Sequence, residues 1–447
     1  MESCWDINSP AIQIDPDQKH EYETINCRDH EIKNEQICTL ISDNKTGNMI
    51  YYLSQFWVAL KITKEDGDNI VEADDVTLVN NGNNCFLQYK LYANDKEIER
   101  KTYTGIQTQV EKLIKYSDDY SRSTATARYW YPDTSIFNEK NKYTYAGTDD
   151  KIKDTVLTAS EFCVHITKNS KFNKGYLKRY NLTKNSNLVW ISIPAAEIFE
   201  FFSIRKIMRG ITFKVEFEKH RKFEDMLIGT SNSKYKVAFE KLIWKIPKYT
   251  PNLITRAQLE TKLLSQEIIK YEWEETITRR SEELKSNDFT YDIIGVNEKP
   301  KYIYIIFQKT KRYNSFKQNN MLFDHMDVRE IEIEWGNEKF SPIKCDFTIG
   351  KLNYIDAYER FLEAGFKNLD VDTGTVVNIN DFASLYPIFC FDVSHHPVEV
   401  YEDRSSNNIK VKVVLGTVSS DAFYLFSFIK VDKSLDLELA GGKMINL

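Results

Sequence analysis

The residues that could do chemistry in this chain are few, and their spacing does not bring them together. Two of the histidines, His395 and His396, are adjacent. Adjacent side chains of an extended segment point to opposite faces, so this pair is poorly placed to bind one metal ion. His325 follows Phe323-Asp324 and is interpreted as a hydrogen-bonding residue at the start of a strand rather than a general base. The sequence therefore predicts no metal site and no cofactor.

Signals for phosphate binding and for acid-base or nucleophilic catalysis are also weak. The run Gly441-Gly442-Lys443 has no helix after it, so we interpret it as part of a C-terminal tail rather than a phosphate loop. No G-x-S-x-G motif occurs. Glu330, Glu332 and Glu334 share one face of a predicted strand, which indicates a solvated face or a row of salt bridges between subunits. We expect no catalytic residue and no enzymatic activity.

Length and composition indicate a large folded chain of two domains. With 447 residues and 52.5 kDa, the chain exceeds the size at which a single core keeps growing. Hydrophobic residues make up 42% and aromatic residues 13%, enough for large cores and extensive partner contacts. The net charge of -6 argues against a protein whose whole surface binds nucleic acid.

The cysteines and the N-terminus indicate a reducing compartment. The seven cysteines form no C-x-x-C pair, and their odd number leaves at least one unpaired, so reduced, buried thiols are expected. The sequence begins Met-Glu-Ser-Cys-Trp-Asp, without the features of a secretory signal. It also contains no stretch of about 18 apolar residues, so no membrane span is expected. The cysteines are Cys4, Cys27, Cys38, Cys85, Cys163, Cys345 and Cys390.

The elements that organise the chain include a strand, turn and helix module that occurs twice. In the first copy, Phe86–Tyr92 alternates apolar and polar residues, turns at Asn94–Glu97 and leads to a helical pattern that begins at Ile106. In the second copy, 328–335 alternates in the same way, turns at 336–339 and leads to a helical pattern from Ile355 to Leu362. Periods near 2 and then near 3.6 predict this order, and its repetition predicts a duplicated β domain.

Strands dominate the rest of the chain, and helices are predicted as insertions in loops. The further strands in the first half are expected at 37–41, 50–62, 189–193, 211–217 and 237–246, with helices at 106–120 and 195–206. In the second half, strands are expected at 271–279, 302–308, 388–393, 409–415 and 423–431, with a helix at 354–365 that Gly365 caps. This order is typical of antiparallel sandwiches with long connections.

These elements divide the chain into four parts. Residues 1–34 are predicted to form a loosely ordered N-terminal arm, because they are polar. Residues 35–252 are predicted as the first β domain, 253–270 as a helical connector and 271–447 as the second β domain. The basic stretch Lys168–Lys184 is interleaved with aromatic residues and could touch nucleic acid, although a solvated loop is the simpler interpretation.

Several segments in a common order resemble the double jelly-roll major capsid proteins of the Polinton/Maverick elements, the adintoviruses and related eukaryotic DNA viruses. The resemblance covers about residues 36 to 431. In the first half it is carried by Val76–Asn81, Phe86–Tyr92, Trp130-Tyr131-Pro132-Asp133, Ile193-Pro194 with the Phe-rich segment after it, and Tyr235-Lys236-Val237. In the second half it is carried by Pro300–Gln308, Asn320–His325, the strand and turn through Glu338, and Tyr358-Glu359-Arg360-Phe361.

The resemblance implies an all-β fold of two tandem eight-stranded antiparallel jelly rolls with helical loop insertions. It also implies a homotrimer of pseudo-hexagonal outline that tiles an icosahedral shell, without catalysis or a cofactor. The implied partners are further copies of the chain, neighbouring capsomers, penton and minor capsid proteins, and, weakly, packaged DNA. The implied location is the virion capsid, after synthesis and assembly in the host cytoplasm or nucleus.

Other function classes remain open at this point. A carbohydrate-binding or attachment protein is the main alternative, because jelly rolls host many functions. A penton-type capsid protein would use one jelly roll and leave half of the chain without a role. A hydrolase is the least supported, because no residue set indicates one.

Overall fold

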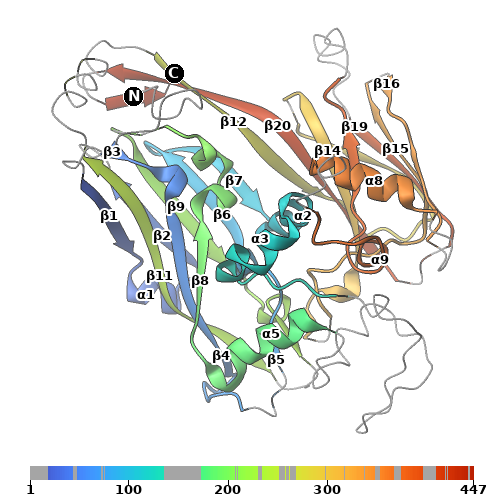
Figure 1. The fold of residues 1–447 in the computed structure, drawn as a ribbon, viewed down its shortest axis with the longest axis horizontal. Helices are drawn as coiled ribbons and strands as arrows, with labels where there is room; N and C mark the ends of the chain where they lie inside the picture. The colour runs from blue at the N-terminus through green and yellow to red at the C-terminus, as the bar shows by residue number, and fades with distance from the viewer. Residues whose placement is uncertain are drawn as a thin grey trace.

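The fold was analysed in a computed structural model of the whole chain. The structure describes residues 19–43, 48–71, 74, 76–134, 173–206, 208, 210–229, 234–250, 257, 261, 268–296, 298–316, 318–336, 338–347, 353–366, 374–395, 409–417, 419, 421–440 and 443–446. Two β-sandwiches stand side by side, the first built mainly from the N-terminal half and the second from the C-terminal half (Figure 1).

The first sandwich consists of two four-stranded antiparallel sheets. One has the order β1-β11-β4-β8 and the other β2-β9-β6-β7, with the short β3 added to β11 and a separate β5-β10 pair. The strands are β1 (Lys19–Asn26), β2 (Ile37–Asp43), β3 (Asn48–Met49), β4 (Gln55–Lys64), β5 (Val76–Leu78), β6 (Phe86–Ala93), β7 (Lys96–Thr102), β8 (Val189–Pro194), β9 (Thr212–Lys219), β10 (Leu227–Gly229) and β11 (Tyr235–Thr250).

The second sandwich repeats this arrangement. Its sheets have the orders β12-β20-β14-β18 and β13-β19-β15-β16, with β21 added to β20 and β17 to β15. The strands are β12 (Ile268–Arg280), β13 (Asp288–Ile293), β14 (Pro300–Lys309), β15 (Val328–Trp335), β16 (Glu338–Lys339), β17 (Ile343–Lys344), β18 (Phe389–Asp392), β19 (Ile409–Leu415), β20 (Phe423–Ala440) and β21 (Lys443–Asn446).

The two sandwiches have the same topology, strand for strand. When the eight main strands of each are numbered in chain order, one sheet contains the first, eighth, third and sixth, and the other the second, seventh, fourth and fifth. This is the order of a jelly roll, so the chain is a double jelly roll, as the family resemblance implied. The predicted duplication is confirmed, because β6 and β15 both occupy the fourth position and are both followed by a helix, α2 (Thr104–Lys115) or α8 (Ile355–Ala364).

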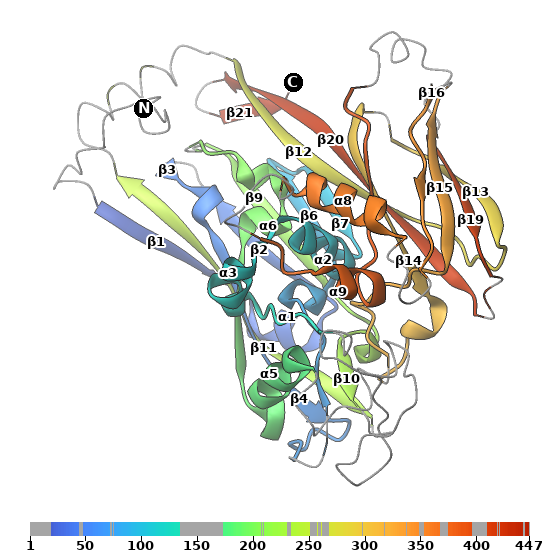
Figure 2. The ribbon, with the colours of Figure 1, turned by 45° about the vertical axis from the view of Figure 1, so that its right-hand side comes forward.

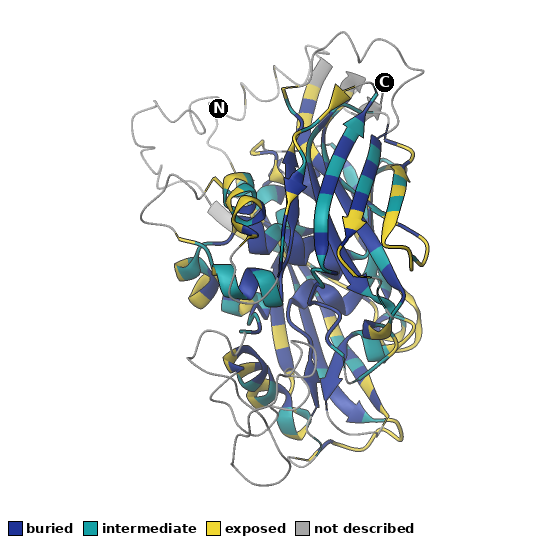
Figure 3. Cartoon of the chain, turned by 90° about the vertical axis from the view of Figure 1, so that its right-hand side faces the viewer, coloured by how far each residue is buried: buried dark blue, intermediate teal, exposed yellow. Residues whose placement is uncertain are grey.

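The alternating strands point their apolar residues into the sandwiches. In β9 and β15 buried residues alternate with partly exposed ones, as the period of 2 predicted. Figure 3 shows buried positions concentrated along the strands and exposed ones along the outer helices and loops. The first core includes the aromatic cluster of Tyr51, Phe56, Phe202, Phe213 and Trp244, in which ring centroids lie 4.7–5.9 Å apart.

β12 and β20 connect the two sandwiches, because they are long enough to reach over the first one (Figures 1 and 2). They pair from Arg280↔Phe426 to Ile268↔Glu438. At the far end of this ribbon, Tyr271 and Trp273 pack against Phe201 of the first sandwich, with ring centroids 5.9 and 5.1 Å apart. The strand predicted at 423–431 is therefore only the first half of β20.

Short helices and turns fill the connections between strands. The remaining α-helices of the described residues are α1 (Asp29–Asn34), α3 (Asp118–Arg122), α5 (Lys174–Thr183), α6 (Ala195–Ile198) and α9 (Ile379–Ser384). No helix among the described residues is long and apolar enough to cross a membrane. α2 lies between the two sandwiches in both views, and α8 lies beside it (Figures 1 and 2).

Three predicted helical or extended segments are broken in the structure. The helix predicted at 106–120 ends at Lys115, because Tyr116 is extended and Ser117 caps a separate helix, α3. The helix predicted at 195–206 stops at Ile198, because Phe199 is extended and a 3-10 turn follows at Glu200–Ser203. The strand predicted at 50–62 starts at Gln55, after a 3-10 turn at Tyr51–Leu53.

Both predicted ends of the chain need correction. Regular structure begins well before Gln36, because β1 pairs with β11 along its whole length and α1 follows it. The prediction of a loose arm is therefore wrong for Lys19–Asn34. Lys443–Asn446, predicted as part of a tail, forms β21 and pairs with the end of β20. Most of the helical connector predicted at 253–270 lies outside the described residues, and β12 begins at Ile268.

Candidate functional site

The turns that link β6 to β7 and β15 to β16 are equivalent corners of the two jelly rolls. In the first, Asn94 and Asp95 have left-handed φ angles of 46° and 68°, which suit a tight hairpin. The Asn94 side chain accepts a hydrogen bond from Thr212 N at 3.0 Å, which ties the corner to β9. In the second, Gly336 has a φ of 61°, and Trp335 pairs with Glu338 across the turn. Asn337 lies outside the described residues.

The helices that follow these corners meet in the seam between the two sandwiches. α2 packs against both α6 and α8. Its apolar residues Ile106, Val110, Leu113 and Ile114 are at most 4% exposed and belong to the same core cluster as the second sandwich, although the helix comes from the first half. The duplication therefore provides two similar domains and also the inserted helices that help to join them.

Asp133, in the Trp-Tyr-Pro-Asp segment, is the centre of a buried polar junction across the seam. Its carboxylate accepts a hydrogen bond from Arg179 Nη2 at 2.7 Å, and the two side chains are 1% and 0% exposed. Its other oxygen accepts from Asn319 Nδ2 at 2.7 Å, and its backbone carbonyl accepts from the Tyr386 hydroxyl at 3.0 Å. Arg179 also donates to Leu78 O at 3.1 Å. The junction thus joins α5 and β5 of the first half to two loops of the second.

Asn81, the second residue of the Asn80-Asn81 pair, anchors α2 through its side chain. Asn81 has a left-handed φ of 78°, and its amide donates to Gly105 O at 2.9 Å and to Thr108 Oγ1 at 2.8 Å. Lys112 Nζ donates to Asn81 Oδ1 at 2.9 Å. Burial lowers the pKa of Lys112 despite the nearby carboxylate of Glu197. The hydrogen bonds of Asn81 to Gly105, Thr108 and Lys112 therefore position the helix.

A second buried cluster, of three carboxylates and a lysine, lies where β7 faces β12. Glu99 accepts backbone hydrogen bonds from Glu200 N at 2.9 Å and Phe201 N at 3.0 Å, and Lys101 Nζ lies 2.5 Å from Glu200 Oε2. Burial raises the pKa of Glu99, with repulsion from Glu200 adding to it. Burial also raises the pKa of Glu275, on β12, to about 7. Carboxylates with raised pKa values can mark catalytic acids, but here Glu99 fixes the turn after α6 and Lys101 pairs with Glu200 in that turn.

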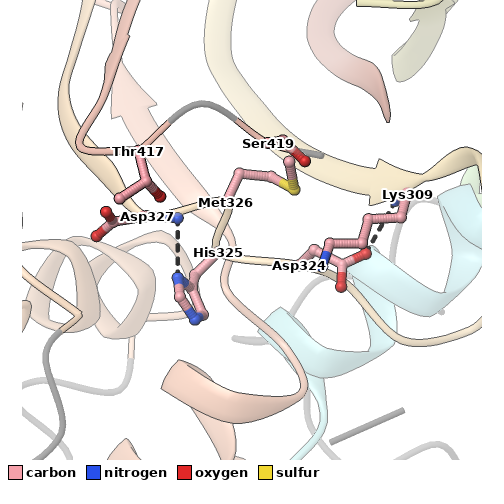
Figure 4. A pocket seen from close by; sticks show the side chains of 7 residues that line it. All are labelled: Lys309, Asp324, His325, Met326, Asp327, Thr417 and Ser419. Carbon is pink, nitrogen blue, oxygen red and sulfur yellow. Dashed lines mark hydrogen bonds between the residues drawn. The ribbon is translucent and has the colours of Figure 1, made fainter. Parts of the chain in front are cut away.

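A cavity of about 290 Å³ lies at one end of the second sandwich, between the end of β14, the loop before β15 and the loop after β19 (Figure 4). Its lining residues are Lys309, Asp324, His325, Met326, Asp327, Thr417 and Ser419. Two consecutive residues, Met326 and Asp327, have left-handed φ angles of 50° and 53°. Figure 4 shows Met326 reaching toward Ser419 while the His325 ring turns back toward its own loop.

His325 has a structural role in this loop, as the sequence predicted. Its Nδ1 accepts a hydrogen bond from Asp327 N at 3.0 Å just before β15, and its ring stacks on Phe347 with centroids 4.7 Å apart. Burial lowers its pKa, so the neutral ring that accepts this hydrogen bond is favoured. The neighbouring Asp324 is held by two bonds of 2.8 Å from Arg312. Burial opposes ionisation of Asp324, but the guanidinium outweighs it and lowers its pKa.

The glutamate row of β15 pairs within the chain. Glu330 lies 4.0 Å from Lys344, Glu332 lies 3.6 Å from Lys339, and Glu334 contacts Lys412 of β19. The hydrogen bond from Lys412 lowers the pKa of Glu334. The sequence allowed either a solvated face or a row of salt bridges between subunits, and these partly exposed pairs within one chain fit the solvated face.

The remaining candidate residues do not converge. His395 is exposed in a turn after β18, and His396 lies outside the described residues. Within the described residues no three His, Cys, Asp or Glu side chains are grouped to hold a metal ion. The described cysteines are free and buried, as expected; they are Cys27, Cys38, Cys85, Cys345 and Cys390. Cys4 and Cys163 lie outside the described residues.

The basic stretch 168–184 is a helix rather than a loop in its described part. α5 buries Tyr176, Arg179 and Thr183 on one side, so the apparent mixture of basic and aromatic residues is an amphipathic helix. Arg179, the cation with the strongest contacts, faces Asp133 and not solvent. Residues 168–172 lie outside the described part of the chain.

Sequence reasoning missed the residues that join the two sandwiches. The sequence shows Asp133 only as the last residue of a mainly aromatic motif, because its partners Arg179, Asn319 and Tyr386 lie 46, 186 and 253 residues away in the chain. No local period reveals such contacts. The one available signal was a charged residue in the otherwise aromatic Trp-Tyr-Pro-Asp segment, since a buried charge requires a partner.

Comparisons with known proteins agree with this architecture. A family model described as a double jelly roll-like domain matches residues 137–419, which run from the first sandwich into the second. No curated protein matches the chain.

Three solved structures with a similar fold come from viruses. The Sputnik virophage structure matches with a TM-score of 0.55 and 9% identity, covering 100% of this chain and 92% of that chain. The capsid of the virus PBCV-1 matches with a TM-score of 0.51 and 10% identity, covering 96% of this chain and 97% of that chain. The Faustovirus major capsid protein matches with a TM-score of 0.50 and 7% identity, covering 95% of this chain and 92% of that chain. At such identities the likeness establishes a shared fold.

Proposed function

Since this chain belongs to the double jelly roll-like domain family, we propose that it is a major capsid protein that trimerises into pseudo-hexagonal capsomers of an icosahedral virus shell. The observation that carries the proposal is the pair of sandwiches with identical strand order in one chain. Three copies of such a chain present six similar units around one axis, which suits a lattice of sixfold neighbours. The role is structural, without a chemical step.

The way the two sandwiches are joined supports an assembly role. The seam holds a buried ion pair, a cluster of carboxylates and an apolar helix shared between both cores. Such a seam fixes the relative orientation of the two jelly rolls, and a capsomer edge needs that orientation to be constant. Apolar and aromatic side chains on the outside, such as Trp190 at 45% and Tyr22 at 69% exposure, are available for contacts between subunits.

The finer parts of the proposal follow from the resemblance. We place the protein with the Polinton/Maverick and adintovirus-like group, in a virion capsid assembled in the host cytoplasm or nucleus. Its partners would be other copies of itself, penton and minor capsid proteins and, weakly, packaged DNA. The proposed domain division is a first jelly roll from Lys19, which includes β1, to residue 252, and a second jelly roll from Ile268, where β12 begins, with the connector between them.

Native mass spectrometry of the purified chain tests the proposal. A trimer of about three times the 52.5 kDa chain mass, or larger assemblies built from it, is expected at micromolar concentration. A protein that stays monomeric as its concentration rises would contradict it. A monomer that binds glycans saturably on an array would instead favour a carbohydrate-binding sandwich protein.

A further inference from the structure

A second cavity, which we call the seam pocket, lies between the two jelly rolls and has a volume of about 240 Å³. The first half contributes the beginning of α2 and His220, and the second half contributes Arg280, Tyr424 and Asn320. The proposed assembly function gives this pocket no role.

Arg280 is a cation held in place without a counterion. Its guanidinium carbon lies 5.0 Å from the ring centroid of Tyr103 and 4.6 Å from that of Tyr424, so two aromatic rings fix its position. The side chain is exposed, and among the described residues no carboxylate forms an ion pair with it. Ring faces leave the N–H donors of a guanidinium free, and those donors match the oxygens of an oxyanion.

The N-terminus of α2 opens into the same pocket. Tyr103, at the N-cap position, makes no capping hydrogen bond, and the first turn contains no acidic side chain. Thr104, Gly105 and Ile106 all line the pocket. The first backbone N–H groups of a helix have no partner within the helix, and they carry the positive end of its dipole. The guanidinium and the helix therefore favour negative charge at one place.

Two buried acceptor atoms in the pocket wall have no partner, and they indicate what else the ligand must carry. Asn320 is 3% exposed and donates its amide to Asp225 O at 2.8 Å, which leaves its Oδ1 without a hydrogen bond. His220 Nε2 is likewise buried and unpartnered. A ligand that satisfies both atoms must donate hydrogen bonds.

We propose that the seam pocket binds one phosphate-type oxyanion that keeps a hydroxyl, as hydrogen phosphate or a singly protonated terminal phosphomonoester. Its charged oxygens accept from Arg280 and from the N-terminus of α2, and its hydroxyl donates to Asn320 Oδ1 or His220 Nε2. Asp225 is the opposing acidic group in the wall, and its Oδ1 is occupied by Asn314 N at 2.9 Å. Because the walls come from both jelly rolls, the bound anion would strengthen the seam.

Titration of the full chain with inorganic phosphate at constant ionic strength tests this proposal. Isothermal calorimetry should show one saturable site per chain, with dissociation below about 10 mM, and the melting temperature should rise with phosphate. Sulfate has no hydroxyl at neutral pH and should bind at least about fivefold more weakly. Methyl phosphate, tested against inorganic phosphate below its second pKa of about 6 so that both ligands keep a hydroxyl, separates free phosphate from a phosphomonoester. Equal binding to it requires room for an ester carbon.

Arg280→Gln should weaken phosphate binding by about tenfold or more, since it removes the charge-assisted bonds. Lys285→Gln is the matched control, because it removes the same charge from the exposed β12–β13 connection and does not line the pocket. It should bind phosphate within about twofold of the unmodified chain. Equal binding by Arg280→Gln and the unmodified chain, or no saturable binding, would overturn the proposal. Neither result depends on capsid assembly.

Discussion

Replacement of Asp133 by asparagine should destabilise the protein strongly, because it leaves the guanidinium of Arg179 buried without its counterion. Both side chains are at most 1% exposed, and the ion pair is 2.7 Å long. Loss of one partner of a buried pair costs about 3–5 kcal/mol. Asparagine has the same shape and keeps one acceptor, so we expect the lower end, about 3 kcal/mol. For a domain of this size that corresponds to a fall in melting temperature of about 6–12 °C.

The chain offers a matched control for this experiment. Asp118 pairs with Arg122 at the same 2.7 Å distance, but the two side chains are 38% and 75% exposed. Water screens such a pair, so Asp118→Asn should cost at most about 0.5 kcal/mol. Both variants would be compared with the unmodified chain by urea unfolding and by calorimetry at one scan rate. If Asp133→Asn lost no more stability than Asp118→Asn, the reasoning about the seam would be refuted.

Two further predictions concern the same seam. Burial raises the pKa of Glu275 to about 7. As the pH rises, the unfolded chain therefore releases this proton before the folded chain does, and the stability that the neutral carboxyl contributes declines between about pH 4.5 and 7. Glu275→Gln should therefore be more stable than the unmodified chain by about 1–3 kcal/mol at pH 8, and the difference should vanish in urea titrations at pH 4.5; a pH-independent difference would contradict this. Phe201→Ala removes a fully buried ring that contacts Tyr271 and Trp273, so it should cost about 3–5 kcal/mol by urea unfolding and increase proteolysis between the sandwiches. A cost below about 1 kcal/mol would show that the long ribbon is not anchored there.

The strands that sequence reasoning found are those with one clearly apolar face. β6, β9 and β15 alternate buried and partly exposed residues, and the period of 2 located them. β1 was missed because the described residues of this edge strand are mostly exposed, so its polar sequence resembled an arm. β7 was missed because its inward residues include Glu99 and Lys101, which are buried only because they pair with groups far along the chain.

Helix boundaries and the seam were harder to predict for a different physical reason. The segment from Ala195 to Ser203 is apolar enough for a helix, but the chain is extended at Phe199 and forms a 3-10 turn after it. In this arrangement Phe201 contacts Trp273 of the ribbon while Phe202 contacts Trp244 of the first core. The Asp133 junction depends on contacts between the two domains. Local propensity carries no information about such contacts.

Negative-stain imaging of the purified chain tests the central claim most directly, because particle shape reports both duplication and trimerisation. The account predicts class averages with threefold symmetry and a six-lobed, pseudo-hexagonal outline, in which each chain contributes two neighbouring lobes. Particles with only one or two lobes across the whole population, unchanged when the protein is concentrated, would contradict it.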